Sequence, residues 1–261
     1  MIYVAVAPPK TFREDLLKKA ASLVGREISD TRLLLAGEIP KIIAHFPDNE
    51  QADSLAQRLR IAGLVAFVCT DFELRNRSAG FVAISLESGE KEEIFRDRRG
   101  GEVRIGADDA FLIIRGTAQR ATQEKTSVTK MKLNVPATLL TGGLPIMRRV
   151  TRETTKESFH SDDFMRIYDR KSSDPLIEML QNSFDYAFLG PDLTPSTPAN
   201  FKILVSKLRK RFALAVFDER LMRRFKTDVP ASGPGKALEI NCKLIYLSQL
   251  AMERSGRTRG I

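Results

Sequence analysis

Apolar and polar residues alternate along the first 70 positions in a pattern that predicts three strands and three helices. Short β-prone runs occupy 2–6, 41–46 and 64–69, and apolar residues at helical spacing occupy the segments 12–24, 29–35 and 52–62. Local residues mark the expected helix ends. Each of the three helix starts has candidate capping residues, in chain order Thr11 with Glu14, Ser29, and Asp48 with Gln51. Gly25 is placed to end the first helix. The predicted order of elements is therefore βααβαβ.

That order and its residues resemble the C-terminal domain of the bacterial ribosomal stalk protein, over Leu17 to Val68. The positions that carry the resemblance are Gly25, Pro40, Asp48, Ala52, Leu55, Leu59 and the pair Ala62-Gly63. The same small fold occurs in ClpS-like adaptor domains, so the resemblance implies docking rather than chemistry. In the stalk family the helices after the first strand recruit translation GTPases, with lysines on the short helix. Here Arg32 keeps one such charge and Ser29 replaces another, so by analogy Ser29, Arg32 and Leu33 are the candidate partner-binding residues.

After residue 70 the pattern changes and resembles no family that we recognise. Residues 71–80 are polar and are interpreted as a linker. Strands are expected at 81–86, 93–97, 103–105 and 110–115, with a glycine turn at 99–101, which together predict an antiparallel β-meander similar to PH-like domains. Residues 117–134 are rich in Thr, Gln and Lys and are interpreted as a connector.

The segment 135–261 predicts mixed strands and helices. Strands are expected at 146–155 and 163–169. Helices are expected to begin at Asp174-Pro175 and Thr197-Pro198, and a buried helix is expected over 237–252. The fold class is therefore α+β, with parts at 1–70, 71–134 and 135–261. The last two parts are open to being one unit.

Composition narrows the classes of protein. The chain has 261 residues, 43% of them hydrophobic, which excludes wholesale disorder, and its apolar runs are too short to cross a bilayer. Two cysteines and two histidines exclude a disulfide framework and argue against a Cys/His zinc site, so no metal or cofactor is expected. Cys69 and Cys242 lie in apolar runs and are interpreted as buried thiols. With no recognisable signal peptide at the N-terminus, these features favour a cytoplasmic protein.

The net charge of +9, from 42 basic and 33 acidic residues, is unevenly distributed. Residues 1–70 carry +1, 71–150 carry +3 and 151–261 carry +5. The densest basic segment, which we call the 202–226 segment, holds Lys202, Lys207, Arg209, Lys210, Arg211, Arg220, Arg223, Arg224 and Lys226. Such a face would attract a phosphate backbone or an acidic protein. The alternative is a solvated helix face whose long side chains shield the core.

Candidate catalytic groups are few. His160 lies near Asp162, Asp163 and Asp169, the one place where a general base and carboxylates cluster, although the composition favours a polar loop between two strands. Gly142-Gly143 lacks the spacing of a phosphate-binding loop. The favoured function is a non-catalytic cytoplasmic binding or regulatory protein that docks a macromolecule, most simply a protein. The alternatives are a nucleic-acid- or ribosome-associated protein that uses the 202–226 segment, and an enzyme with a site around His160.

Overall fold

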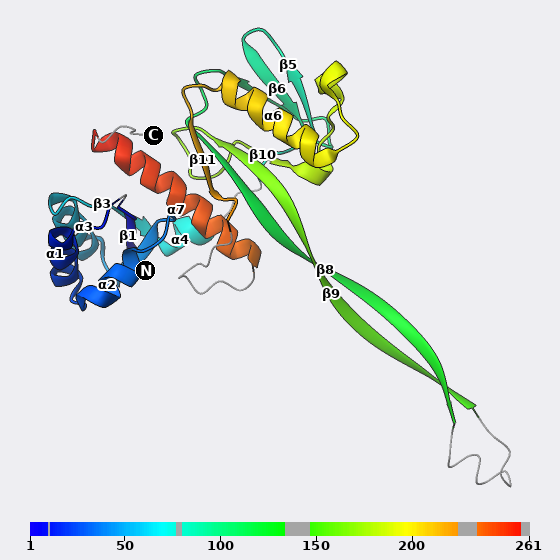
Figure 1. Cartoon of the computed structure of the whole chain (residues 1–261), viewed down its shortest axis with the longest axis horizontal. Coiled ribbons are helices and arrows are strands. Elements are labelled where there is room, and N and C mark those ends of the chain that lie inside the picture. The colour runs from blue at the N-terminus through cyan, green and yellow to red at the C-terminus, as the bar shows by residue number, and fades with distance from the viewer. Residues whose placement is uncertain (10, 77–79, 134–146, 224–233, 257–261) are drawn as a thin grey trace. The chain divides into compact units, whose positions relative to one another are not determined.

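The computed structural model describes residues 1–9, 11–76, 80–133, 147–223 and 234–256. The chain is an α+β protein, as predicted, with helices and several sheets (Figure 1). Its internal contacts divide it into two units. One consists of Met1–Ala118 with Asp162–Ile261, and the other is Gln119–Ser161. The expected boundaries at 70 and 134 stay predictions.

The first six elements follow the expected order: β1 (Ile2–Ala7), α1 (Glu14–Val24), α2 (Ile28–Leu35), β2 (Lys41–Phe46), α3 (Asn49–Ile61) and β3 (Val65–Thr70). They form an antiparallel sheet in the order β2-β1-β3. Val4 and Val6 share one apolar cluster with α1, α2 and α3, whereas Ala5 belongs to a different cluster. Because successive side chains of a strand point to opposite faces, β1 is buried on both faces of the sheet.

Two of the predicted helix starts are wrong. α1 begins at Glu14 without a side-chain cap, so Thr11 lies before the helix, and the acidic first turn offsets the helix dipole instead. α2 begins at Ile28 and also has no side-chain cap, which places Ser29 inside the first turn.

The other helix signals of this region are confirmed. The side chain of Asp48 accepts a hydrogen bond from the backbone N–H of Gln51 at 2.9 Å, and α3 follows it. Gly25 ends α1 in the left-handed conformation, with φ at 68°, which glycine adopts without a Cβ clash.

The rest of the chain contains a short helix, α4 (Asp71–Arg75), where a linker was expected, capped by the hydroxyl of Thr70. The following elements are β4 (Val82–Ala83), β5 (Ser85–Ser88), β6 (Glu92–Arg96), β7 (Glu102–Gly106), β8 (Leu112–Leu133), β9 (Met147–Tyr168), β10 (Ile177–Leu180), two 3₁₀ turns (Gln181–Ser183 and Ala187–Asp192), α6 (Thr197–Arg211), β11 (Val216–Leu221) and α7 (Pro234–Arg254).

The expected meander exists only in part. β5, β6 and β7 form a three-stranded antiparallel sheet. The predicted strand 81–86 is split between β4 and β5, and the predicted strand 110–115 starts β8 in a different sheet. That second sheet has five strands in the order β11-β8-β9-β10-β4. The interpretation of 117–134 as a connector is wrong, because β8 continues to Leu133, and the two strands expected in 146–169 are one strand, β9.

The helix expected from Asp174 is also wrong. Residues Ile177–Leu180 form β10, whose four side chains are all buried. The strand is buried on both faces, and its apolar residues Ile177 and Leu180, together with Phe184 and Phe188 beyond it, produced a false helical spacing. The helices expected at Thr197 and over 237–252 are confirmed as α6 and α7.

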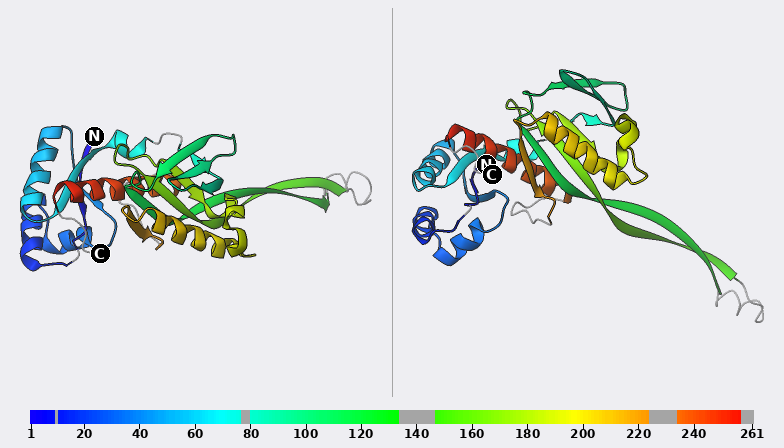
Figure 2. Two further views of the ribbon diagram at one scale, coloured as in Figure 1. Left: turned by 90° about the horizontal axis from the view of Figure 1, so that it is seen from above. Right: turned by 45° about the horizontal axis from the view of Figure 1, so that its top comes forward.

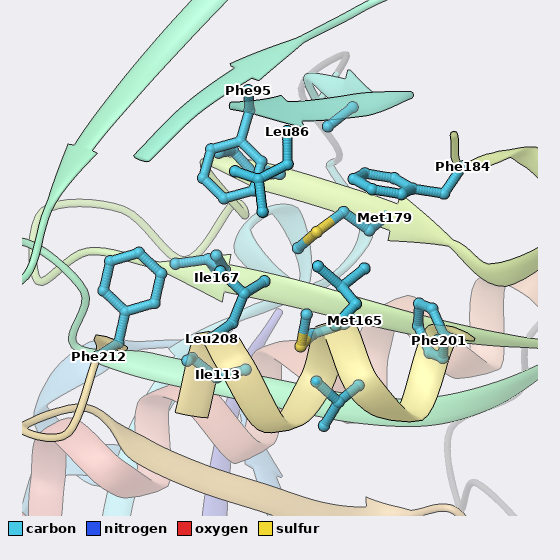
Figure 3. Packing of buried hydrophobic residues seen from close by; sticks show 14 of the residues in the cluster. Leu86, Phe95, Ile113, Met165, Ile167, Met179, Phe184, Phe201, Leu208 and Phe212 are labelled. Atoms are coloured by element: carbon cyan, nitrogen blue, oxygen red, sulfur yellow. The ribbon is translucent and has the colours of Figure 1, made fainter. Parts of the chain in front are cut away.

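Two helices cover the faces of the five-stranded sheet. Ile113, Met165 and Ile167 pack with α6 and with the β5-β6-β7 sheet in one cluster (Figure 3). Strand neighbours of these residues, including Leu112 and Tyr168, face α7 in another cluster. The opposite side of α7, through residues such as Ile240 and Leu244, packs against Phe67 and the N-terminal sheet. α7 therefore lies between two sheets (Figure 2), and much of its surface is buried between them.

Candidate functional site

The predicted partner-binding residues share one face of α2, which we call the α2 face. Ser29, Arg32 and Leu33 stand three and four positions apart, and all three side chains are exposed, Leu33 by 71%. The opposite side of the helix is anchored by Thr31 and Leu35, which are buried in the N-terminal core. Ile28, at the start of the helix, adds a second partly exposed apolar side chain. The structure thus brings the three predicted residues together on one accessible surface.

The 202–226 segment is less free than its composition suggests. On α6, Lys207 forms an ion pair with Asp192 at 3.0 Å. Arg211 pairs with Glu93 at 3.1 Å and donates a hydrogen bond to the carbonyl oxygen of Glu90 at 2.9 Å. Part of the positive charge on this helix is therefore neutralised by Asp192, in the turn before α6, and by Glu93 of β6.

Three basic residues of α6 have no acidic partner in the described part of the chain: Lys202, Arg209 and Lys210. The guanidinium of Arg209 lies over the ring of Phe217, 4.8 Å from its centroid, a cation–π contact. The last turn of α6 contains Arg209, Lys210 and Arg211, where positive charge interacts favourably with the helix dipole. Local structure alone accounts for much of this cluster.

The basic residues near β11 are also paired. Arg220 binds Asp218, whose side chain is 5% exposed, at 2.6 Å, and donates a hydrogen bond to the carbonyl oxygen of Glu38 at 2.6 Å. Arg223 forms an ion pair with the carboxylate of Glu38. These contacts join β11 to the loop that follows α2. Arg224 and Lys226 lie outside the described residues.

The structure describes the candidate catalytic groups only in part. The side chain of His160 and the pair Gly142-Gly143 lie outside what the structure describes, and His45 is exposed on β2. Within the described ranges no group of His, Cys, Asp and Glu side chains is arranged to hold a metal ion. A surface hollow of about 470 Å³ lies beside β5, but its one arginine, Arg96, is bound to Glu87 and Glu102.

Both cysteines are buried, as expected, and neither forms a disulfide. Burial raises the pKa of the Cys69 thiol to about 12, with a smaller contribution from the charge of Glu73. Burial likewise raises the pKa of Cys242 to about 11. Because the thiolate is the reactive form, both side chains are inert packing groups at neutral pH.

Sequence reasoning missed a buried ionic cluster between the five-stranded sheet and α7. Arg166 of β9, almost wholly buried, binds Glu178 of β10 at 2.8 Å and Glu239 of α7 at 2.6 Å. The alternation of Phe164, Arg166 and Tyr168 along a strand was the available indication, since it places a charge among inward-facing aromatic residues. The cluster fastens α7 to the sheet, since Glu239 belongs to the helix and Arg166 and Glu178 belong to strands.

With this geometry in view, the comparisons add no relative: no family model, curated protein or solved structure matches the chain. In the described parts of the chain, no helix combines the length and apolarity needed to cross a bilayer.

Proposed function

We propose that this chain is a non-catalytic binding or regulatory protein of the cytoplasm, whose N-terminal module docks a protein partner through the α2 face. The observation that carries the proposal is the exposure of Leu33, an apolar side chain that is 71% accessible beside Arg32. Grouped apolar side chains with a polar rim are typical of protein-interaction sites. The likeness of residues 17–68 to stalk and adaptor domains supports the same face, and two free thiols fit a reducing compartment.

The test compares two leucine-sized exposed positions of the N-terminal module. Leu33→Asp removes the apolar centre of the α2 face, and Ile61→Asp makes a matched change at the end of α3, where Ile61 is 80% exposed. Partners captured on the tagged full chain are purified, and their affinity for each variant is measured by titration calorimetry. We expect Leu33→Asp to weaken binding about tenfold or more, and Ile61→Asp to leave it within about twofold. Equal affinities for both variants would refute the role of α2.

A nucleic-acid- or ribosome-associated function through the 202–226 segment is the alternative, supported by Lys202, Arg209 and Lys210. If these residues contact phosphates, the double variant Lys202→Glu, Lys210→Glu reduces the salt dependence of nucleic-acid binding by about two contacts. An unchanged salt slope would show that these residues of the 202–226 segment do not contact phosphates. An enzyme centred on His160 is a third class, and an activity that survives His160→Ala would exclude it.

A further inference from the structure

The second unit of the chain, Gln119–Ser161, contains a two-stranded antiparallel ribbon. We define the ribbon as residues 119–133 of β8 and 147–161 of β9 (Figure 1). The neighbouring strands do not reach it: β11 pairs with β8 only between Leu112 and Gly116, and β10 pairs with β9 only between Phe164 and Ile167. Fifteen residues of each strand at about 3.3 Å per residue give the ribbon a length of roughly 50 Å.

The amino-acid sequence of the ribbon shows no apolar face. Of its 30 residues, the apolar ones are Ala121, Val128, Met131, Leu133, Met147, Val150 and Phe159. They follow no period of two along either strand, in contrast to the start of β8, where Leu112, Ile113 and Ile114 are all buried. An isolated two-stranded ribbon is at best marginally stable in water. Since the ribbon belongs to a separate unit and its sequence shows no apolar face, stabilising the fold does not explain its length, whereas contact with another molecule does.

The charge of the ribbon indicates which molecule. Residues 119–161 contain eight basic and three acidic side chains, so +5 of the net charge of +9 lies in this unit. The basic residues are distributed along both strands: Arg120, Lys125, Lys130, Lys132, Arg148, Arg149, Arg152 and Lys156. Between them lie many Ser, Thr and Gln residues, whose hydroxyl and amide groups also bind phosphate oxygens.

We propose that the ribbon is a binding element for duplex DNA. A B-form duplex carries one negative charge per about 1.7 Å, so a ribbon of roughly 50 Å faces about 30 phosphates. The major groove, about 12 Å wide, admits a two-stranded β-ribbon, whereas the major groove of A-form RNA is too narrow for side chains to read. The spread of basic residues over the whole ribbon matches a long, uniformly charged ligand better than a local acidic patch on a protein. This site is independent of the α2 face and of the 202–226 segment.

The test measures binding of the full chain to a labelled mixed-sequence 25-base-pair DNA duplex by fluorescence anisotropy. If four of the eight basic side chains contact phosphates, the slope of log K against log salt is about −3.6, and affinity falls about 150-fold between 50 and 200 mM salt. The ribbon variant Lys125→Glu, Lys130→Glu, Lys156→Glu is expected to lose more than about tenfold in affinity and to flatten the slope.

A matched variant carries the same change of charge in the other unit: Lys19→Glu, Lys91→Glu, Lys171→Glu, at exposed positions outside the α2 face and the 202–226 segment. We expect it to retain affinity within about threefold. The milder variant Lys125→Gln, Lys130→Gln, Lys156→Gln repeats the measurement if charge reversal unfolds the ribbon, which circular dichroism would reveal. Greater loss in the matched variant than in the ribbon variants would overturn the proposal.

Titrations with other ligands test whether the ribbon prefers a molecule other than duplex DNA. Single-stranded DNA, duplex RNA of the same sequence and vesicles containing phosphatidylserine are titrated under the same conditions. Duplex DNA is expected to bind most tightly. Preference for any of the other three, or a salt slope near zero with duplex DNA, would refute the assignment. The α2 variant Leu33→Asp is expected to bind DNA normally, so failure of one proposal leaves the other open to its own test.

Discussion

The buried cluster around Arg166 provides a sharp test of how α7 is held in place. Its guanidinium is bound by two carboxylates from different elements, and the side chains of Arg166, Glu178 and Glu239 are 2%, 10% and 15% exposed. In the variant Arg166→Met, the apolar length of the side chain is kept and its charge is lost. Two carboxylates in a poorly solvated site then lose the guanidinium that binds them both. Removing one partner of a buried ion pair costs about 3–5 kcal/mol of unfolding free energy.

Urea unfolding followed by circular dichroism measures this cost. With a slope of about 2 kcal/mol per molar urea, the midpoint of Arg166→Met is expected to fall by about 2 M. Arg170→Met is the matched control on the same segment, because Arg170 pairs with Glu253 at 3.2 Å but is half exposed. An exposed pair contributes about 0–1 kcal/mol, so the control is expected to lose at most about 0.5 M.

A further variant shows whether the buried charge itself is responsible. Replacing the cluster with Arg166→Met, Glu178→Leu and Glu239→Leu removes all three charges and keeps apolar volume. Because buried ion pairs can be exchanged for apolar groups at little cost, this triple variant is expected to be more stable than Arg166→Met alone. The reasoning is refuted if Arg166→Met and Arg170→Met cost the same, or if the triple variant is the least stable.

Three further predictions concern stability. Gly116→Ala is expected to cost about 1–3 kcal/mol by urea unfolding, because its Cβ would lie 2.7 Å from both the Cβ of Leu221 and the ring of Phe164, whereas Gly80→Ala, with 3.8 Å to its nearest neighbour, is expected to be nearly neutral. Lys243→Met is expected to cost about 3 kcal/mol, since the buried ammonium binds the carbonyl oxygen of Glu73 at 2.8 Å and Asp174 at 3.0 Å; a loss below about 1 kcal/mol would contradict this role. The raised thiol pKa values of Cys69 and Cys242 mean that the unfolded chain releases these protons first, so their stabilisation is complete below about pH 8.5 and is lost between there and about pH 11–12. Each thiol is expected to cost about 1.4 kcal/mol per pH unit in that window, and thermal unfolding of Cys69→Ala, Cys242→Ala should show a shallower alkaline decline than the unsubstituted chain.

The elements that sequence reasoning found are those with local determinants. α6 has a serine cap, a proline in its first turn and an apolar stripe, and all three act within the helix itself. α3 is similar, with Asp48 at its start. β10 was mistaken for a helix because its burial on both faces depends on distant neighbours rather than on its own four residues. The pairing of Arg166 could not be foreseen either, since its partners lie 12 and 73 positions away.

The ribbon was not predicted from the sequence for a different reason. Its strands lack the period of two that a half-buried strand requires, so 117–134 had the composition of a connector. Ser29, Arg32 and Leu33 lie together on an exposed side of α2 because they follow helical spacing, with the buried Thr31 and Leu35 on the other side. For the 202–226 segment, sequence indicated where the charge lies, but not the acidic residues that neutralise part of it, such as Glu93.

The position of α7 has a consequence for biosynthesis. The N-terminal sheet is complete at Thr70, and α7 begins only at Pro234, so the helix that covers one of its faces is translated more than 160 residues later. At about 5–20 residues per second, a nascent chain waits roughly 10–30 s with that apolar face uncovered. A chain truncated before α7 would keep the faces that α7 covers on both sheets permanently exposed. The docking of α7 therefore follows the synthesis of both sheets, and chaperones that bind apolar surface have their longest opportunity before it.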